Sequence, residues 1–236
     1  MATVSAVLIT RNEERNLPQA LRSLRWVDDL VVVDGASTDR TAEIARSFGA
    51  RVFVREPRNA VDEDRAFSVE QAGGDWVFAL DADEMVPASL ARRLRALADG
   101  GTADAYRIPR LNHVFGRPLR GGMWAPSRDR PLRFFRKGSV ELGDALHSFI
   151  RPAPGARVEA LAVAPGDWIV HFAYRDVAQH LEKMNRYTTI EARQALERGE
   201  RPRSTPAGLA RAAARFFLAY ARGGWRDGWR GAYLAA

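Results

Sequence analysis

The sequence predicts an α/β protein built on a mostly parallel sheet that helices cover on both faces. Short apolar, β-branched runs alternate with segments in which apolar residues recur every three or four positions. Four of these strand patterns come early in the chain, at residues 3–10, 30–33, 51–55 and 76–80. Because helical segments separate them, neighbouring strands should run parallel and be joined by right-handed crossovers.

The second half of the chain is less regular. Helical spacing recurs at residues 87–98 and 176–198, and strand patterns at 103–108, 132–136 and 167–172. A segment rich in Pro and Arg, residues 199–206, is the only plausible linker. We therefore predict one α/β domain over residues 1–198 and a basic amphipathic extension over residues 199–236.

Composition limits the cellular context and the partners. The chain of 236 residues has no Cys, which excludes disulfides, Cys-ligated zinc and thiol catalysis. No stretch is apolar enough to span a bilayer and no signal peptide pattern opens the chain, so we expect it in the cytoplasm. Of the net charge of +7, the segment 199–236 carries seven Arg against Glu200 and Asp227, which leaves the rest nearly neutral. This local charge does not suit a nucleic-acid binder and points instead to an anionic surface.

The basic extension has two interpretations. Leu209, Phe216, Phe217 and Tyr220 fall on one helical face and arginines on the rest, which is typical of a helix that lies in a membrane interface. The alternative is an ordinary helix that packs on the core with its arginines in solvent. The sequence leaves both open.

Two carboxylates follow the fourth strand pattern. Asp81 and Asp83 come directly after the apolar run 76–80, and ligands of open α/β sheets bind beyond the carboxyl ends of the strands. Carboxylate oxygens suit Mg²⁺ or Mn²⁺, which also take substrate phosphates as ligands. A second Asp-x-Asp, Asp62 to Asp64, has no strand before it and is expected on a solvated helix.

Four ordered motifs together resemble a known family. VSAVLITRNEERNL, LVVVDGASTDRT, Arg65 in an otherwise acidic helix and DWVFALDADE resemble the family 2 glycosyltransferases of the GT-A fold. RFFRKG, DALHSF, HFAY and NRYTTIEA further resemble the bacterial branch that adds a sugar to the lipopolysaccharide inner core. The resemblance implies a nucleotide-binding half over about residues 1–100 and an acceptor half over about 101–198.

The resemblance also implies roles for individual residues. Asp34 would meet the base or ribose, Arg65 would lie beside the nucleotide, and Asp83 would hold the metal that bridges the donor's diphosphate. The residues expected at the nucleotide are Thr10, Arg11, Asn12, Glu13, Asp34, Arg65, Asp81 and Ala82. Asp81 would touch the ribose or the metal.

The general base is less clear from the sequence. Many relatives place Glu directly after the histidine of the loop that here reads Asp144-Ala145-Leu146-His147-Ser148, and Ser148 cannot take a proton in that way. We expect Asp144 to be the base, with Glu141 and Asp129 as alternatives. Gly35 is a second departure, since many members carry an acid there.

Several of these residues also have a purely structural interpretation. Asp34 could cap the following helix, and Arg65 could pair with Asp62 or Glu63 at the surface. His171 follows a strand and could complete the metal site or be an ordinary core residue. The aromatics could form a platform for sugar rings, but core packing is expected for at least half of them: Phe115, Trp124, Phe134 and Phe135.

Together these observations predict an inverting glycosyltransferase that depends on Mg²⁺ or Mn²⁺. It would move a hexose, with glucose favoured, from a UDP-sugar to a lipopolysaccharide-core or other glycolipid acceptor. The basic tail would hold it on the anionic cytoplasmic face of the inner membrane. The alternatives are a nucleotidyltransferase, which would usually show a glycine-rich loop after the first strand, and a non-catalytic scaffold that binds nucleotide sugars.

Overall fold

The computed structural model describes residues 1–56, 61–142, 150–200 and 205–235, which form two compact units. Unit 1 comprises Met1–Arg110 and Arg130–His171, and unit 2 comprises Leu111–Asp129 and Phe172–Ala236. Helix α5 (Val177–Glu197) belongs to unit 2 together with the C-terminal helices. The domain boundary that the sequence predicted at residue 198 stays a prediction.

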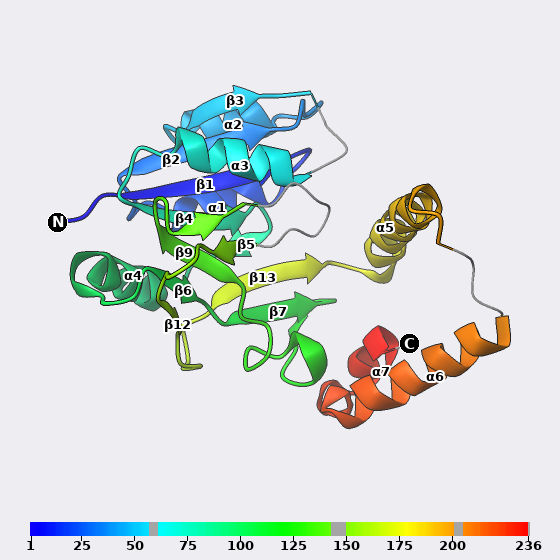
Figure 1. Cartoon of the computed structure of the whole chain (residues 1–236). Coiled ribbons are helices and arrows are strands. Elements are labelled where there is room, and N and C mark those ends of the chain that lie inside the picture. The colour runs from blue at the N-terminus through cyan, green and yellow to red at the C-terminus, as the bar shows by residue number, and fades with distance from the viewer. Residues whose placement is uncertain (57–60, 143–149, 201–204, 236) are drawn as a thin grey trace. The chain divides into compact units, whose positions relative to one another are not determined.

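Unit 1 is built on a seven-stranded sheet (Figure 1). The four strands on one side of it run parallel, and β9 runs antiparallel to both of its neighbours. In spatial order the strands are β12 (Val158–Ala160), β6 (Ala105–Arg107), β9 (Leu132–Arg136), β4 (Trp76–Asp81), β1 (Val4–Thr10), β2 (Asp29–Asp34) and β3 (Arg51–Val54). This mostly parallel sheet confirms the predicted fold class.

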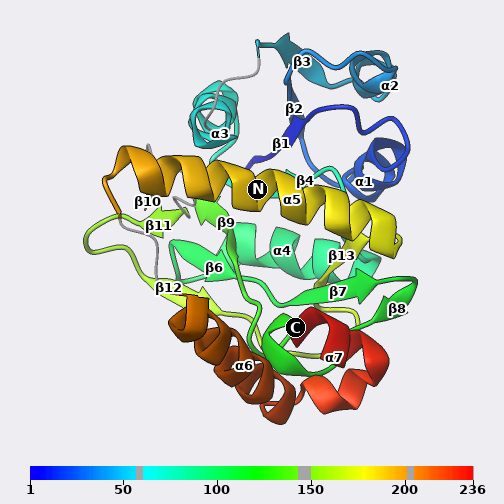
Figure 2. The same cartoon turned by 90° about the vertical axis from the view of Figure 1, so that its right-hand side faces the viewer.

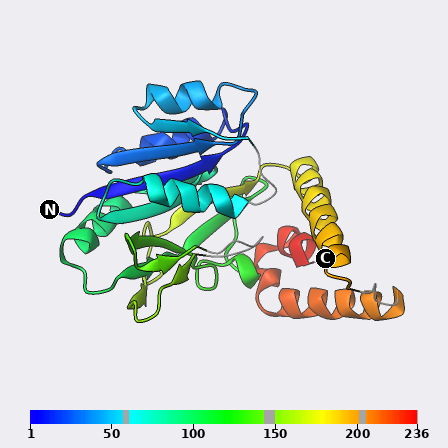
Figure 3. The same ribbon diagram turned by 45° about the horizontal axis from the view of Figure 1, so that its top comes forward.

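Helices cover both faces of the sheet (Figures 1 and 3). Side chains alternate between the two faces along each strand, so neighbouring residues of one strand belong to different cores. Val4, Ala6 and Leu8 of β1 belong to one core with helices α1, α2 and α4. Val7 belongs to the opposite core, which helix α3 covers. The helices span α1 (Leu17–Ser23), α2 (Thr41–Ser47), α3 (Val61–Gln71) and α4 (Ala88–Gly100).

Stacked aromatic rings form the centre of the first core. Trp76 and Phe134 lie face to face with ring centroids 4.6 Å apart, and Tyr106 stacks on both. Phe135 is buried on the other face of β9. Phe134 and Phe135 are therefore core residues and are not available as a sugar platform.

The strand register brings the ends of three strands together. Thr10 is paired with Asp34 across β1 and β2, and Ile9 with Asp81 across β1 and β4. Beyond β4 the chain turns and forms β5 (Glu84–Met85), which pairs antiparallel with β13 (Ile169–Tyr174) so that Glu84 faces His171. A two-stranded sheet of β10 (Val140–Glu141) and β11 (Arg151–Pro152) completes unit 1.

Unit 2 joins residues 111–129 to the C-terminal helices (Figure 2). The carboxylate of Asp227 accepts the backbone N–H groups of Arg120 and Gly121 at 2.7 and 2.9 Å. Phe115 stacks on Trp229 with centroids 5.7 Å apart. The elements of this unit are β7 (Arg110–Val114), which begins at the unit boundary, β8 (Arg117–Pro118), η1 (Gly122–Trp124), α5, α6 (Thr205–Ala221), η2 (Gly224–Asp227) and α7 (Trp229–Ala235).

The basic extension has two parts that differ in burial. Residues 224–235 pack within unit 2, where Gly224 and Gly231 are buried. Helix α6 contributes no buried residue, and Leu209 and Phe217 on it are 67% and 68% exposed. Among the described helices, none combines the length and the apolar character needed to cross a bilayer.

Candidate functional site

Two loops at the carboxyl ends of β1 and β2 are held together by hydrogen bonds. The backbone N–H of Asn12 donates to Ser37 Oγ, and the side chain of Asn12 accepts the N–H of Thr38, both at 2.8 Å. Glu13 N donates to Thr41 Oγ1, also at 2.8 Å. The predicted residues Thr10, Arg11, Asn12 and Glu13 therefore lie beside the loop that follows Asp34.

Asp34 is buried and organises its own loop. Its carboxylate accepts both the backbone N–H and the hydroxyl of Ser37. Helix α2 begins only at Thr41, where the side chain of Asp39 accepts the N–H of Thr41. Asp34 thus closes a turn ahead of the helix and does not cap it.

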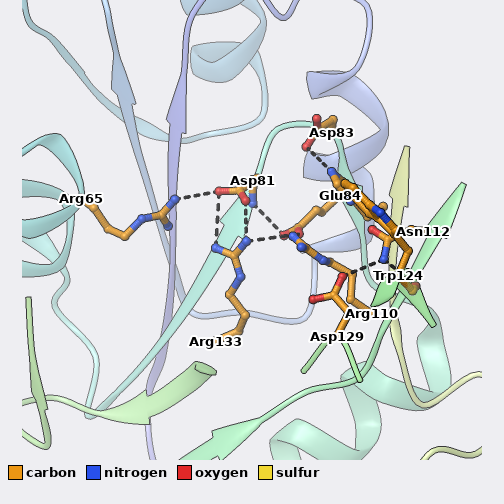
Figure 4. A network of polar contacts seen from close by, with 10 residues as sticks. Arg65, Asp81, Asp83, Glu84, Arg110, Asn112, Trp124, Asp129 and Arg133 are labelled. Atoms are coloured by element: carbon orange, nitrogen blue, oxygen red, sulfur yellow. Dashed lines mark hydrogen bonds and ion pairs between the residues drawn. The ribbon is translucent and has the colours of Figure 1, made fainter. Parts of the chain in front are cut away.

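Asp81 lies between two arginines (Figure 4). Arg65 donates to its Oδ1 at 2.8 Å, and Arg133 contacts both of its carboxylate oxygens. Burial alone would raise the pKa of Asp81, but the charges of Arg133 and Arg65 outweigh it and hold the pKa well below its usual value. Asp81 is therefore ionised, and Arg65 forms an ion pair with it inside the site.

Glu84 is the most deeply buried acid of this cluster, with no exposed side-chain surface. Its Oε1 accepts Arg110 Nη1 at 3.0 Å and Arg133 Nη2 at 3.2 Å, and its Oε2 accepts the backbone N–H of Asp81 at 3.0 Å. Burial lowers the pKa of Arg133, but the negative charges of Asp81 and Glu84 overcome this and raise it. Arg133 therefore keeps its positive charge between the two acids.

Asp83 and His171 form a second pair at the same edge (Figure 4 shows Asp83). Asp83 Oδ1 lies 3.6 Å from His171 Nε2, and both side chains keep some exposed surface, 16% and 13%. In the part of the chain that the structure describes, no three His, Asp or Glu side chains form a complete metal cage. A carboxylate and an imidazole nevertheless fit Mn²⁺ or Mg²⁺, since these ions fill their remaining positions with water and substrate phosphates.

The structure describes two of the three candidates for the general base. Asp144, His147 and Ser148 lie outside the described residues. Glu141 is exposed at the end of β10. Asp129 belongs to unit 2, where Asn112 Nδ2 donates to its carboxylate at 2.7 Å.

Sequence reasoning did not assign roles to Glu84, Arg110 and Arg133. A signal for Arg133 was present, because it is a charged residue inside the apolar strand pattern 132–136, and the fold buries it. A buried arginine requires a carboxylate partner. Nothing in the sequence indicated which acid this would be, since Glu84 lies 49 residues away along the chain.

Comparisons with known proteins agree with this geometry. Residues 5–162 match the family described as "Glycosyl transferase family 2". The lipopolysaccharide core biosynthesis glycosyltransferase LpsC of Rhizobium meliloti is 30% identical over 213 residues, which cover 85% of this chain and 74% of that protein. A TPR repeat-containing protein of Synechococcus elongatus is 32% identical over 200 residues, which cover 84% of this chain and 48% of that protein.

Solved structures show the same fold. TarS 1–349 of S. aureus matches with a TM-score of 0.54 and 18% identity, over 72% of this chain and 60% of that one. At this identity the match speaks for the fold alone. The family match covers most of unit 1, including β1, β2 and β4 and the acids at their ends. The resemblance noted from the motifs is confirmed: the chain belongs to the family 2 glycosyltransferases and has the GT-A fold.

Proposed function

We propose that this glycosyltransferase moves a hexose, glucose in the first instance, from a UDP-sugar to a lipopolysaccharide-core or other glycolipid acceptor with inversion. One observation supports the proposal most strongly. Thr10, Asp34 and Asp81 lie together at one edge of the sheet, beside the pair Asp83–His171. Open α/β sheets bind nucleotides at this edge. Family membership favours glycosyl transfer over nucleotidyl transfer or a scaffold role.

The loops after β1 and β2 are suited to the nucleoside. Asp34 is buried and preordered by Ser37, so it can accept a hydrogen bond from a base or a ribose without further ordering. Gly35 leaves space beside it, because a Cβ there would meet Arg11 and Thr10 only at ordinary contact distances of 3.6 Å. The backbone at this position therefore has room for a Cβ.

The acids after β4 are suited to the diphosphate. Asp83 and His171 would hold a divalent cation, Asp81 would touch the ribose or the cation, and Arg65 would lie beside the phosphates. A bound cation acts as a Lewis acid that stabilises the negative charge of the departing nucleoside diphosphate. Arg65 and Arg133 add positive charge at the same place, and their positions are fixed before the ligand arrives.

Transfer with inversion also requires a base. The acceptor oxygen bonds to the anomeric carbon while the bond from that carbon to the diphosphate oxygen breaks, and the acceptor proton passes to a carboxylate. Asp144 remains our candidate, with Glu141 and Asp129 as alternatives. Replacement of each by its amide, followed by transfer assays with one acceptor, would identify the base.

The relatives and helix α6 support the proposed acceptor class. LpsC is named for lipopolysaccharide core biosynthesis. Arg211, Arg215 and Arg222 accompany the exposed apolar residues of α6, which suits an anionic bilayer surface. We propose that α6 holds the enzyme on the cytoplasmic face of the inner membrane.

Isothermal titration of UDP and of GDP, each with and without Mn²⁺, tests the donor assignment. The proposal expects UDP to bind in the presence of Mn²⁺, to bind more weakly without it, and to exceed GDP in affinity. Tighter binding of GDP would change the donor class. Absence of binding by either diphosphate would remove the support for a donor site at this edge.

A further inference from the structure

Glu84 is buried at the centre of the site, yet it does not face a ligand. Its side chain has no exposed surface, whereas Asp81 and Asp83 keep 30% and 16%. All three hydrogen bonds that the structure gives its carboxylate go to the protein itself. Glu84 therefore has no direct part in the roles proposed for Asp81, Asp83 and His171.

One of these bonds closes the turn that carries the ligand-facing acids. Glu84 Oε2 accepts the backbone N–H of Asp81 at 3.0 Å, so the carboxylate spans the segment Asp81-Ala82-Asp83. The backbone of Glu84 in turn pairs with His171 of β13. The same residue thus fixes the turn that presents Asp83 and the strand that presents His171.

The other bonds hold two arginines. Arg133 is 9% exposed and lies between Glu84 and Asp81, and Arg110 contacts Glu84 from β7. Among the described groups of the cluster, Asp81, Asp83 and Glu84 supply three negative charges, and Arg65, Arg110 and Arg133 supply three positive ones. Removal of one member of such a buried set leaves a charge without compensation.

We propose that Glu84 is a positioning residue of the donor site: it fixes the turn from Asp81 to Asp83 and holds Arg133 against Asp81. It acts through these residues and touches neither cation nor diphosphate. The inference deepens the proposed function and rests on the donor site assigned above. It predicts that the charge of Glu84, and not only its shape, sets the affinity of that site.

Glu84→Gln is the variant that separates charge from shape. The amide oxygen can still accept the N–H of Asp81, but the negative charge that holds Arg110 and Arg133 is lost. Loss of a residue that holds the ligating side chains in place without touching the metal typically costs about 10–100-fold in affinity or activity. We expect a loss of this size in the affinity for UDP with Mn²⁺ and for Mn²⁺ alone, and a fall in kcat with little change in the KM of the acceptor.

Asp28→Asn is a matched control at the opposite edge of the sheet. Asp28 also accepts a backbone N–H, from Val4, and two bonds from one arginine, Arg95. If general loosening of unit 1 weakened the donor site, this variant would weaken it too. We expect its affinities for UDP with Mn²⁺ and for Mn²⁺ alone to stay within about twofold of wild type, because the pair Arg95–Asp28 has no contact with the cluster.

The measurements are titration calorimetry of UDP with Mn²⁺, Mn²⁺ binding followed by electron paramagnetic resonance, and thermal unfolding of each variant. If Glu84→Gln does not fold, the double variant Glu84→Gln/Arg110→Gln, which removes one charge of each sign, takes its place. Affinities within twofold of wild type in a folded variant would overturn the proposal, as would an equal loss in Asp28→Asn. Wild-type protein that binds Mn²⁺ but not UDP would overturn the donor assignment alone, since the Mn²⁺ comparison still tests Glu84. Wild-type protein that binds neither would overturn both.

Discussion

The two units of this glycosyltransferase use their charged residues in opposite ways. In unit 1 the arginines at the sheet edge are buried or half-buried and already paired, with Arg133 only 9% exposed between two acids. In unit 2 the arginines of helix α6 accompany apolar side chains in solvent, such as Phe217 at 68% exposure. The first arrangement is preorganised for a small charged ligand, and the second suits an extended anionic surface.

The two units also differ in what positions their charged side chains. The cluster in unit 1 depends on contacts between distant parts of the chain, such as Arg133 with Asp81, 52 residues apart. The face of α6 depends on helical periodicity alone. A single substitution in the cluster should therefore have a large effect, and a single substitution on the face of α6 a small one.

The largest expected effect is that of Asp83→Asn. Loss of a residue that only positions a metal ligand already costs about 10–100-fold. Loss of a proposed ligand itself should therefore lower kcat/KM by at least about 100-fold. Transfer of a labelled sugar measures this, with thermal unfolding as a check that the fold is intact. Glu43→Gln, which removes an exposed acid paired with Arg40, is the control and should retain wild-type activity. An active Asp83→Asn enzyme would contradict the metal assignment.

A pair of glycine substitutions tests the packing of unit 2. A Cβ on Gly231 would lie 1.8 Å from the carbonyl oxygen of Gly224, so Gly231→Ala should lower the free energy of unfolding by about 1–3 kcal/mol, as overpacking does. A Cβ on Gly208 of α6 meets nothing within 4 Å, so Gly208→Ala should stabilise that helix by up to about 1 kcal/mol. Denaturant unfolding of the two variants measures both changes. Equal effects would mean that residues 224–235 do not pack as described.

Substitution on the exposed face of α6 tests its proposed use. Phe217→Glu should leave the thermal midpoint nearly unchanged because the side chain is exposed, but it should weaken binding to anionic vesicles about tenfold, near the lower value for burying one Phe side chain. Val54→Glu, at an exposed apolar position of β3, is the control and should bind vesicles as wild type does. Vesicle sedimentation provides the measurement. Unchanged binding by Phe217→Glu would refute a membrane role for this face.

The smallest expected effect is a pH dependence of stability at His180. Burial lowers the pKa of His180 below its usual 6.5, and its ring lies against Phe115, Tyr174 and the hydroxyl of Tyr233. Between the pKa of His180 in the folded protein and 6.5, the unfolded chain binds more protons than the folded chain does. The stability that comes from a neutral His180 is therefore fully present above pH 6.5 and is lost as pH falls through the folded pKa. His180→Gln should remove this dependence, amounting to about 1.4 kcal/mol for each unit by which the pKa is lowered. Unfolding curves at pH 5.5 and 7.5 compare the two proteins, and an equal fall in both would place the dependence elsewhere.

The sequence predicted the strands and helices of unit 1 well because their signal is local. The apolar run of β4 and the acids after it already indicated which edge of the sheet would bind a ligand. The sequence did not indicate which charged side chains would pair with one another at that edge. Arg65 was expected beside the nucleotide, but nothing in the sequence indicated that it would pair with Asp81, 16 residues away.

Unit 2 shows a different limit of sequence reasoning. Amphipathic periodicity identified the helix α6 but could not tell that residues 224–235 pack through glycine contacts while α6 itself buries nothing. A close approach of two backbones leaves no periodic signal, because the residues that permit it have no side chains. Only the arrangement in space distinguishes the two parts of the extension.

The central claim is that the donor's cation is held by Asp83 and His171 at the carboxyl edge of the sheet. The anomalous diffraction of Mn²⁺ in crystals grown with UDP tests it most directly. The account predicts one Mn²⁺ within bonding distance of a carboxylate oxygen of Asp83 and of His171 Nε2, with the remaining ligands supplied by the diphosphate and water. A Mn²⁺ ion bound to other residues, with UDP ordered elsewhere, would contradict it.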